Sequence, residues 1–207
     1  MNKKNIMVIS LATVIYISMS ILNGVSFGAT FREGVFEVTL PASFERASKP
    51  KVDELRKSMM GGSRELAEAS KLVNPRDISD KGVAFLSVFQ NQNGKLLLML
   101  IGMQSPVVVD RDEMYRSNVE KIKWGIDSGR LQKASKGVSK LSIDGVPCLL
   151  QDIETQVGAR MLTYEFFIPG ASKGVFSVCI ACDDNPTYIA NTRDIETIIK
   201  SIRVISK

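Results

Sequence analysis

The feature of this sequence that most restricts its fold is an uninterrupted apolar run, Leu-Leu-Leu-Met-Leu-Ile, at residues 96–101. Residues 83–90 precede it as a second candidate strand, and Asn-Gln-Asn-Gly at residues 91–94 is typical of a hairpin turn. Successive side chains of a strand point to opposite faces of its sheet, so a strand that is apolar throughout must be covered on both faces. We therefore predict that residues 96–103 form a central strand between two helical layers.

Before this hairpin, the chain carries one strand pattern and one helix pattern. Residues 35–40 alternate between apolar and polar side chains and end at Pro41, which predicts a strand. Apolar residues then recur every three or four positions over residues 52–73, which predicts a helix. Two glycines, Gly61 and Gly62, lie in the middle of this helix, where each costs about 1 kcal/mol relative to alanine. We expect a break or kink there.

After the hairpin, Asp110 and Glu113 have the spacing of a capping box, which predicts the start of a second helix. Its predicted buried stripe is Tyr115, Val119, Ile122 and Ile126. A third helix is predicted to begin at Asn185, as N-cap, and Pro186, as first helical residue. Its predicted inner stripe is Ile195, Ile198, Ile199 and Ile202.

Between these helices lie four closely spaced strand patterns, at residues 138–143, 146–156, 160–168 and 174–181. Asp144-Gly145 joins the first two and favours a tight type I′ turn. Hairpin-length connections join consecutive strands, so the sheet must be mostly antiparallel. With helices on both faces, the predicted fold class is α+β, a three-layer α/β/α sandwich around a mostly antiparallel sheet.

The N-terminus has the three parts of a secretory signal peptide. Lys3 and Lys4 precede an uncharged apolar run at residues 6–22, and small residues follow at Ser26 and Gly28. We predict a signal peptide at residues 1–28, a single domain at residues 29–207, and an extracytoplasmic location, periplasmic or secreted. The alternative is an uncleaved membrane anchor, and membrane contact is expected only through that segment.

Export and charge restrict the partners. Removal of residues 1–28 would leave a net charge of +3, which is too mild for a nucleic-acid binder, and export makes nucleic acid a poor partner. We expect a monomer whose partner is another envelope protein or an anionic envelope component.

The pattern over residues 31–207 resembles the PsbP-like superfamily. The resemblance rests on Gly34-Val35-Phe36 through Leu40-Pro41, on Phe44, on the Asp144-Gly145 hairpin with its four-strand meander, and on the closing helix end at residues 198–203. That superfamily includes an extrinsic protein of photosynthetic oxygen evolution, a Ran-binding import factor and many exported bacterial proteins. The resemblance implies a binding or assembly module. It implies no catalytic residue and does not transfer the photosynthetic or Ran-binding role.

Composition excludes several kinds of chemistry. The chain has no histidine, which rules out histidine-based triads and imidazole metal sites. Cys179 and Cys182 match C-x-x-C, but they lie at the end of a predicted strand instead of opening a helix, so we expect inert thiols. The meander order predicts no disulfide between Cys148 and Cys179. Asp183-Asp184-Asn185 lacks the further ligands of a calcium loop, and we predict neither a metal nor a cofactor.

The candidate binding residues lie on and after the second helix. Trp124 is predicted to lie opposite the buried stripe, with Leu131 near the same side if the helix continues. Residues 116–140 carry a local charge of +5, and Lys121, Lys123 and Arg130 surround Trp124 in sequence. An exposed tryptophan among cations is typical of a contact surface. The alternative is that another segment covers Trp124 and that the charges only solvate the helix.

These observations predict an exported, non-enzymatic binding or assembly module of the cell envelope. The first rival is a hydrolase-type enzyme that uses a carboxylate pair, for which Glu154 and Glu165 lie on neighbouring predicted strands. The alternative is that both carboxylates occupy solvent-facing strand positions and have no catalytic role. The second rival is a structural accessory subunit of a membrane complex, held by an uncleaved first helix.

Overall fold

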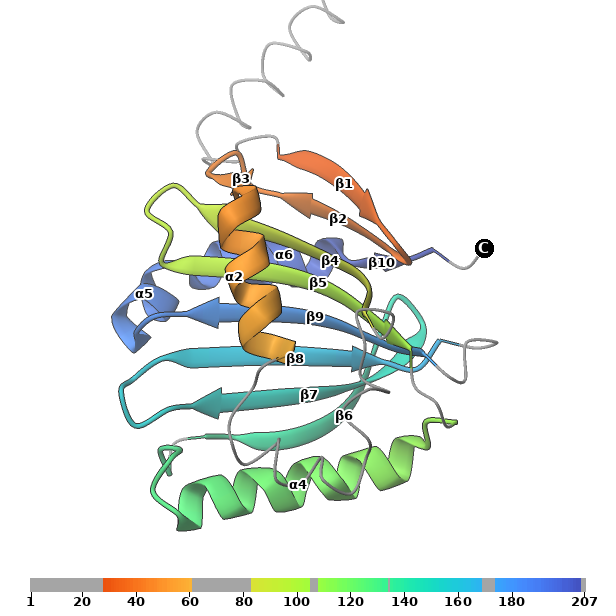
Figure 1. The fold of residues 1–207 in the computed structure, drawn as a ribbon, viewed down its shortest axis with the longest axis vertical. Coiled ribbons are helices and arrows are strands. Elements are labelled where there is room, and N and C mark those ends of the chain that lie inside the picture. Colours follow the sequence, from red (N-terminus) through yellow and green to blue (C-terminus); the bar gives the residue numbers. More distant parts are fainter. Residues whose placement is uncertain (1–27, 61–82, 105–107, 134, 169–173, 206–207) are drawn as a thin grey trace, which may run out of the picture.

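The computed structural model describes residues 28–60, 83–104, 108–133, 135–168 and 174–205 (Figure 1). Its main element is a seven-stranded sheet in which every neighbouring pair is antiparallel. In spatial order the strands are β3 (Phe44–Arg46), β4 (Val83–Asn91), β5 (Leu96–Gln104), β9 (Gly174–Cys182), β8 (Arg160–Phe166), β7 (Val146–Glu154) and β6 (Gly137–Ile143). The predicted antiparallel sheet is therefore confirmed, including the consecutive order of the four-strand meander.

The apolar run occupies β5, the third strand of the sheet, as predicted. On one face, Leu96, Leu98 and Leu100 are fully buried, while on the other face Ile101 is buried and Leu97 is half-buried. Helix α2 (Lys49–Met60) lies over that second face, and α6 (Thr192–Ser201) lies on the opposite side of the sheet (Figure 1). The two-sided burial of a continuous apolar strand thus has the predicted structural cause.

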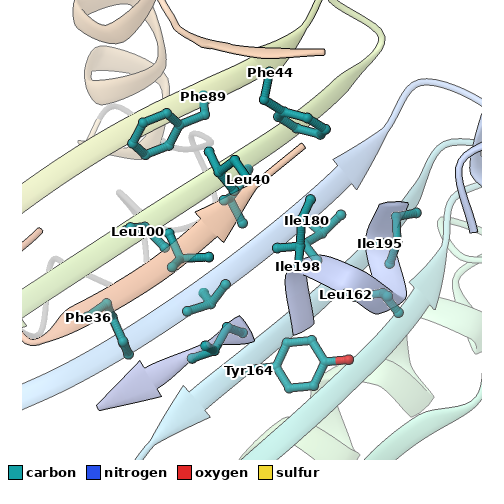
Figure 2. Packing of buried hydrophobic residues seen from close by; sticks show 14 of the residues in the cluster. Phe36, Leu40, Phe44, Phe89, Leu100, Leu162, Tyr164, Ile180, Ile195 and Ile198 are labelled. Atoms are coloured by element: carbon teal, nitrogen blue, oxygen red, sulfur yellow. The ribbon is translucent and has the colours of Figure 1, made fainter. Parts of the chain in front are cut away.

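A second, three-stranded sheet lies in the same layer as α6. The strand at residues 36–40 was predicted, but its membership of a separate sheet was not. The order of this sheet is β1 (Ala29–Glu33), β2 (Phe36–Leu40) and β10 (Arg203–Val204), all antiparallel. The fully buried Phe36 and Val38 of β2 and Ile198 of α6 pack in one cluster with Leu100, Tyr164 and Ile180 of the main sheet (Figure 2). This layer is therefore built from both chain ends.

The turns and register of the meander agree with local sequence. Asp144 and Gly145 both have positive φ, 52° and 76°, as a type I′ turn requires. Cys148 lies opposite Phe166, which lies opposite Phe176, so Cys179 is three residues farther along β9. All three cysteines are free, in keeping with the expected lack of a Cys148–Cys179 bridge.

Three helix predictions need correction or qualification. Helix α2 begins at Lys49, and the predicted continuation beyond Met60 lies outside the described residues. The C-terminal helix is two helices, α5 (Asn185–Ala190) and α6, separated at Asn191. The N-cap of α5 is Asp184 instead of Asn185, because the Asp184 carboxylate accepts a hydrogen bond from the Thr187 amide over 2.6 Å.

The predicted signal segment lies outside the described residues except for Gly28. Within the described ranges, no helix has the length and apolar character that a membrane span requires.

Candidate interaction surface on helix α4

Helix α4 (Arg111–Asp127) carries the candidate site and lies along β6 and β7 at one margin of the sheet (Figure 1). It begins as predicted, since the Asp110 carboxylate accepts a hydrogen bond from the Glu113 amide over 2.7 Å. Its buried residues are Asn118, Ile122 and Gly125. The predicted stripe is wrong at Val119, which is 39% exposed. The inner face of α4 is rotated toward Asn118 and Gly125. Apolar periodicity does not identify these two residues, because neither has an apolar side chain.

Trp124 projects from the outer side of α4, as predicted, and is 56% exposed. The Arg130 guanidinium lies over its ring, with Cζ 4.5 Å from the ring centroid. This contact depends on the end of the helix. Gly129 has a φ of 71°, and the amides of Arg130 and Leu131 both donate to the Gly125 carbonyl, over 2.8 and 2.9 Å. Such a left-handed turn returns the chain toward the helix it has just left.

Leu131 does not lie on the outer surface with Trp124. The helix ends at Asp127, and the returning chain leaves Leu131 half-buried near Gly125. A Cβ atom at residue 125 would be only 2.7 Å from Leu131 Cδ1, so the glycine is what allows this approach. Leu131 also forms an isolated antiparallel bridge with Thr155. It therefore anchors the segment that carries Arg130 instead of facing a partner.

The segment after α4 is fastened to the β7–β8 hairpin along its length. The backbone amide of Gln132 donates to the Glu154 carbonyl over 2.7 Å, and the backbone amide of Gln156 donates to the Arg130 carbonyl over 3.2 Å. Next to Gln156, the hairpin tip exposes 85% of Val157. Val157 was not predicted as a surface residue, although an apolar side chain beside the Gly158-Ala159 turn was the available signal. We call Lys121, Lys123, Trp124, Arg130 and Val157 the α4 surface.

Not all of the basic residues in this region face outward freely. Lys140 lies 2.7 Å from Asp112, and Lys136 lies 3.8 Å from Asp152, in each case from ammonium nitrogen to carboxylate oxygen. The hydrogen bond from Lys140 lowers the pKa of the Asp112 carboxyl. Between residues 116 and 136, the exposed cations are Arg116, Lys121, Lys123, Arg130, Lys133 and Lys136. With the exposed Glu120 and Asp127 among them, the region keeps an excess of positive charge.

The two carboxylates of the enzyme hypothesis do not form a pair. Glu154 lies opposite Arg160 at the end of β8, whereas Glu165 lies five residues farther along the same strand. Odd spacing along a strand places their side chains on opposite faces of the sheet. Glu165 also does not face solvent freely, because Asn118 Nδ2 donates to its Oε2 over 2.7 Å. Burial raises the pKa of the Glu165 carboxyl.

The cysteines and the Asp183-Asp184 corner offer no reactive centre. Burial raises the pKa of Cys148 to about 12 and those of Cys179 and Cys182 to about 11. Neither C-x-x-C thiol is therefore activated as a nucleophile. Across the described part of the chain, no group of three or more Cys, Asp or Glu side chains is arranged to hold a metal ion.

The antiparallel sheet, its helices on both faces and the peripheral α4 surface define an α+β protein with the PsbP-like fold. The solution structure of cyanobacterial PsbP (CyanoP) from Synechocystis sp. PCC 6803 is similar to this chain, with a TM-score of 0.50. The match covers 87% of this chain and 94% of CyanoP at 12% sequence identity, which supports the fold alone. Comparison of the sequence with protein-family models and with curated proteins gave no match.

Proposed function

We propose that this protein is an exported, non-enzymatic binding or assembly module of the cell envelope. In this proposal the α4 surface contacts an acidic surface of another envelope protein. The observation that carries the proposal is the exposed Trp124 ring with the Arg130 guanidinium stacked on it at 4.5 Å. Tryptophan and arginine are the residues most enriched at energetic centres of interfaces.

Three further observations support a protein contact. The backbone amide of Arg130 donates to the Gly125 carbonyl, which fixes the backbone of Arg130 against the end of α4. This preorganisation lowers the entropy cost of binding. Lys121 and Lys123 add positive charge beside the tryptophan, which favours and steers an acidic partner. The resemblance to the PsbP-like superfamily implies a module that works by binding, and the opposed positions of Glu154 and Glu165 disfavour the carboxylate-pair enzyme.

The proposal is tested by affinity capture of the exported protein from its native envelope, quantified by mass spectrometry. Trp124→Ala is expected to weaken capture of a specific acidic protein at least about tenfold, the effect of a central interface residue. Its free energy of unfolding should change by less than about 0.5 kcal/mol. The matched control is Ile189→Ala, which truncates another apolar side chain that is 65% exposed, on α5.

Three outcomes would contradict the proposal. A large fall in melting temperature for Trp124→Ala would make the residue structural. Equal capture by Trp124→Ala, Ile189→Ala and the unchanged protein would remove the α4 surface from binding. Binding to anionic vesicles without capture of a protein would replace the acidic protein by an anionic envelope component. The intact mass of the exported protein reports separately on cleavage after Gly28, since an uncleaved chain would favour the membrane-held accessory subunit.

A further inference from the structure

A groove with a volume of about 250 Å³ lies between α4 and the beginning of β6. Its apolar lining comes from both elements, and a cation stands on each side. These lining residues are Val119, Ile122, Ile126 and Val138, with Lys123 on α4 and Lys136 before β6. The groove adjoins the α4 surface, because Lys123 belongs to both.

The groove is open because of the orientation of α4. The inner face of α4 is centred on Asn118, Ile122 and Gly125, so Val119 is left at the margin with 39% of its surface exposed. On the opposite side the lining includes Gly137, which contributes only backbone, and Val138. The apolar surface of Val119 is therefore left uncovered opposite Val138.

The charges around the groove favour an acidic ligand. The Lys123 side chain is exposed, and the Lys136 side chain is 73% exposed although its ammonium group lies 3.8 Å from Asp152. An exposed ion pair at that distance leaves the lysine able to bind a second carboxylate. Asp127 lines one part of the groove, so the rim also suits the amide donors of a peptide backbone.

The size of the groove favours a side chain over a cofactor. Pockets that hold small-molecule ligands usually enclose about 300–1,000 Å³, and this groove is smaller and open to solvent. One or two apolar side chains of an extended peptide fit such a site, with flanking carboxylates near the lysines.

We propose that the α4–β6 groove receives an apolar side chain of an acidic peptide segment from the partner protein. This inference rests on the proposed function, because it places a second contact of the same partner beside the Trp124–Arg130 pair. The tryptophan then supplies the contact on the outer side of α4, and the groove supplies the pocket that selects an apolar residue flanked by acidic ones.

The test is an amide NMR titration of the exported protein with the capped peptide Asp-Glu-Leu-Phe-Glu-Asp. Two matched peptides replace the four acidic residues by lysine or the Leu-Phe pair by Ser-Ser. The acidic apolar peptide is expected to shift the amides of Val119, Lys123, Ile126 and Val138, and the matched peptides are not. Lys123→Glu should weaken binding at least about fivefold, as should Val119→Trp, whose larger side chain fills the groove from a helix surface. Lys133→Glu, the same charge change on an exposed residue outside the groove lining, should leave affinity within about twofold.

The inference is overturned if the shifts lie outside the groove, if the lysine peptide binds equally well, or if Lys133→Glu weakens binding as much as Lys123→Glu does. Shifts at the groove with sodium decanoate but with none of the peptides would replace the peptide by an acyl chain. Failure of the proposed function is a separate result. Peptide binding in the groove, together with envelope capture that survives Trp124→Ala, would contradict the Trp124 surface alone. Capture that needs Trp124, without peptide binding, would contradict the groove alone.

Discussion

Asn118 donates a hydrogen bond from Nδ2 to Oε2 of Glu165 over 2.7 Å, which joins the inner face of α4 to the C-terminal end of β8. The two residues are 47 positions apart in the chain. Asn118 is only 4% exposed, so this polar contact lies in the interface that holds the helix against the sheet. Because the helix carries Trp124 on its other side, the pair is part of the support for the proposed binding surface.

The first prediction concerns the pH dependence that Glu165 imposes. Burial raises the pKa of the carboxyl in the folded protein, so just above its ordinary value of about 4.5 the native state keeps a proton that the unfolded chain has released. Stability contributed by this group is therefore highest at low pH and falls as the pH rises through the folded-state pKa. Glu165→Gln removes this titration. The variant should gain stability relative to the unchanged protein near neutral pH, and gain less in acid, as measured by chemical denaturation at several pH values.

The matched variants are Asn118→Leu and Glu154→Gln. Asn118→Leu leaves the Glu165 carboxylate without its amide donor and should cost about 1–3 kcal/mol near neutral pH. Glu154→Gln removes a carboxylate from the opposite face of the sheet and controls for the loss of one negative charge. If the stability of Glu165→Gln varied with pH in parallel with that of the unchanged protein, the raised pKa of Glu165 would be contradicted.

The second prediction concerns the close approach of Gly125 and Leu131. A methyl group at residue 125 would lie 2.7 Å from Leu131 Cδ1 and 2.9 Å from its Cγ, so Gly125→Ala must displace Leu131. We expect Gly125→Ala to destabilise the protein by about 1 kcal/mol. In a Leu131→Ala background the same change should stabilise it by up to about 1 kcal/mol, because alanine favours the helix and nothing obstructs it. Thermal unfolding of the four proteins measures this coupling, and strictly additive effects would show that the contact is absent.

The third prediction concerns the thiols. Since burial raises the pKa of Cys179 and Cys182 to about 11 and that of Cys148 to about 12, native protein should react with iodoacetamide very slowly at mildly alkaline pH. After unfolding in guanidinium chloride, all three should be alkylated. Peptide mass mapping distinguishes the sites. Rapid modification of Cys179 or Cys182 in the native protein would instead support a redox role for the C-x-x-C sequence.

The fourth prediction concerns Asp144, whose carboxylate accepts a hydrogen bond from the Val204 amide over 3.1 Å. The same carboxylate lies 3.8 Å from Arg203, and the residue has a φ of 52°. Asp144→Ala removes the acceptor of the Val204 hydrogen bond. It also leaves alanine, which tolerates the left-handed conformation less well than aspartate, so the variant should lose about 1–2 kcal/mol of stability. Asp144→Asn keeps an acceptor and tolerates that conformation, so its cost should be smaller. Equal losses for both variants, measured by urea denaturation, would show that the hydrogen bond from the Val204 amide contributes nothing.

Much of this architecture follows from local sequence. The alternation of side chains, the Asp144-Gly145 turn and the spacing of Asp110 and Glu113 act over a few residues, and the structure contains each of the elements that they predict. The exposure of Trp124 was also predictable, because its position opposite the main apolar stripe of α4 requires only the helical period. Leu131 was misplaced, because its position depends on a left-handed turn at Gly129 that ends the helix first.

Local sequence is enough to predict the strands, the turns and the two-sided burial of β5, since these depend on backbone preference and on which side chains avoid water. The tertiary structure centred the inner face of α4 on Asn118 and Gly125, because the partner of Asn118 is 47 residues distant. It also decided that β10 pairs with β2 and that Thr39 bonds to Ser201, 162 residues away. Such contacts join segments whose local patterns carry no information about each other, and the groove beside Val119 exists because of how those segments meet.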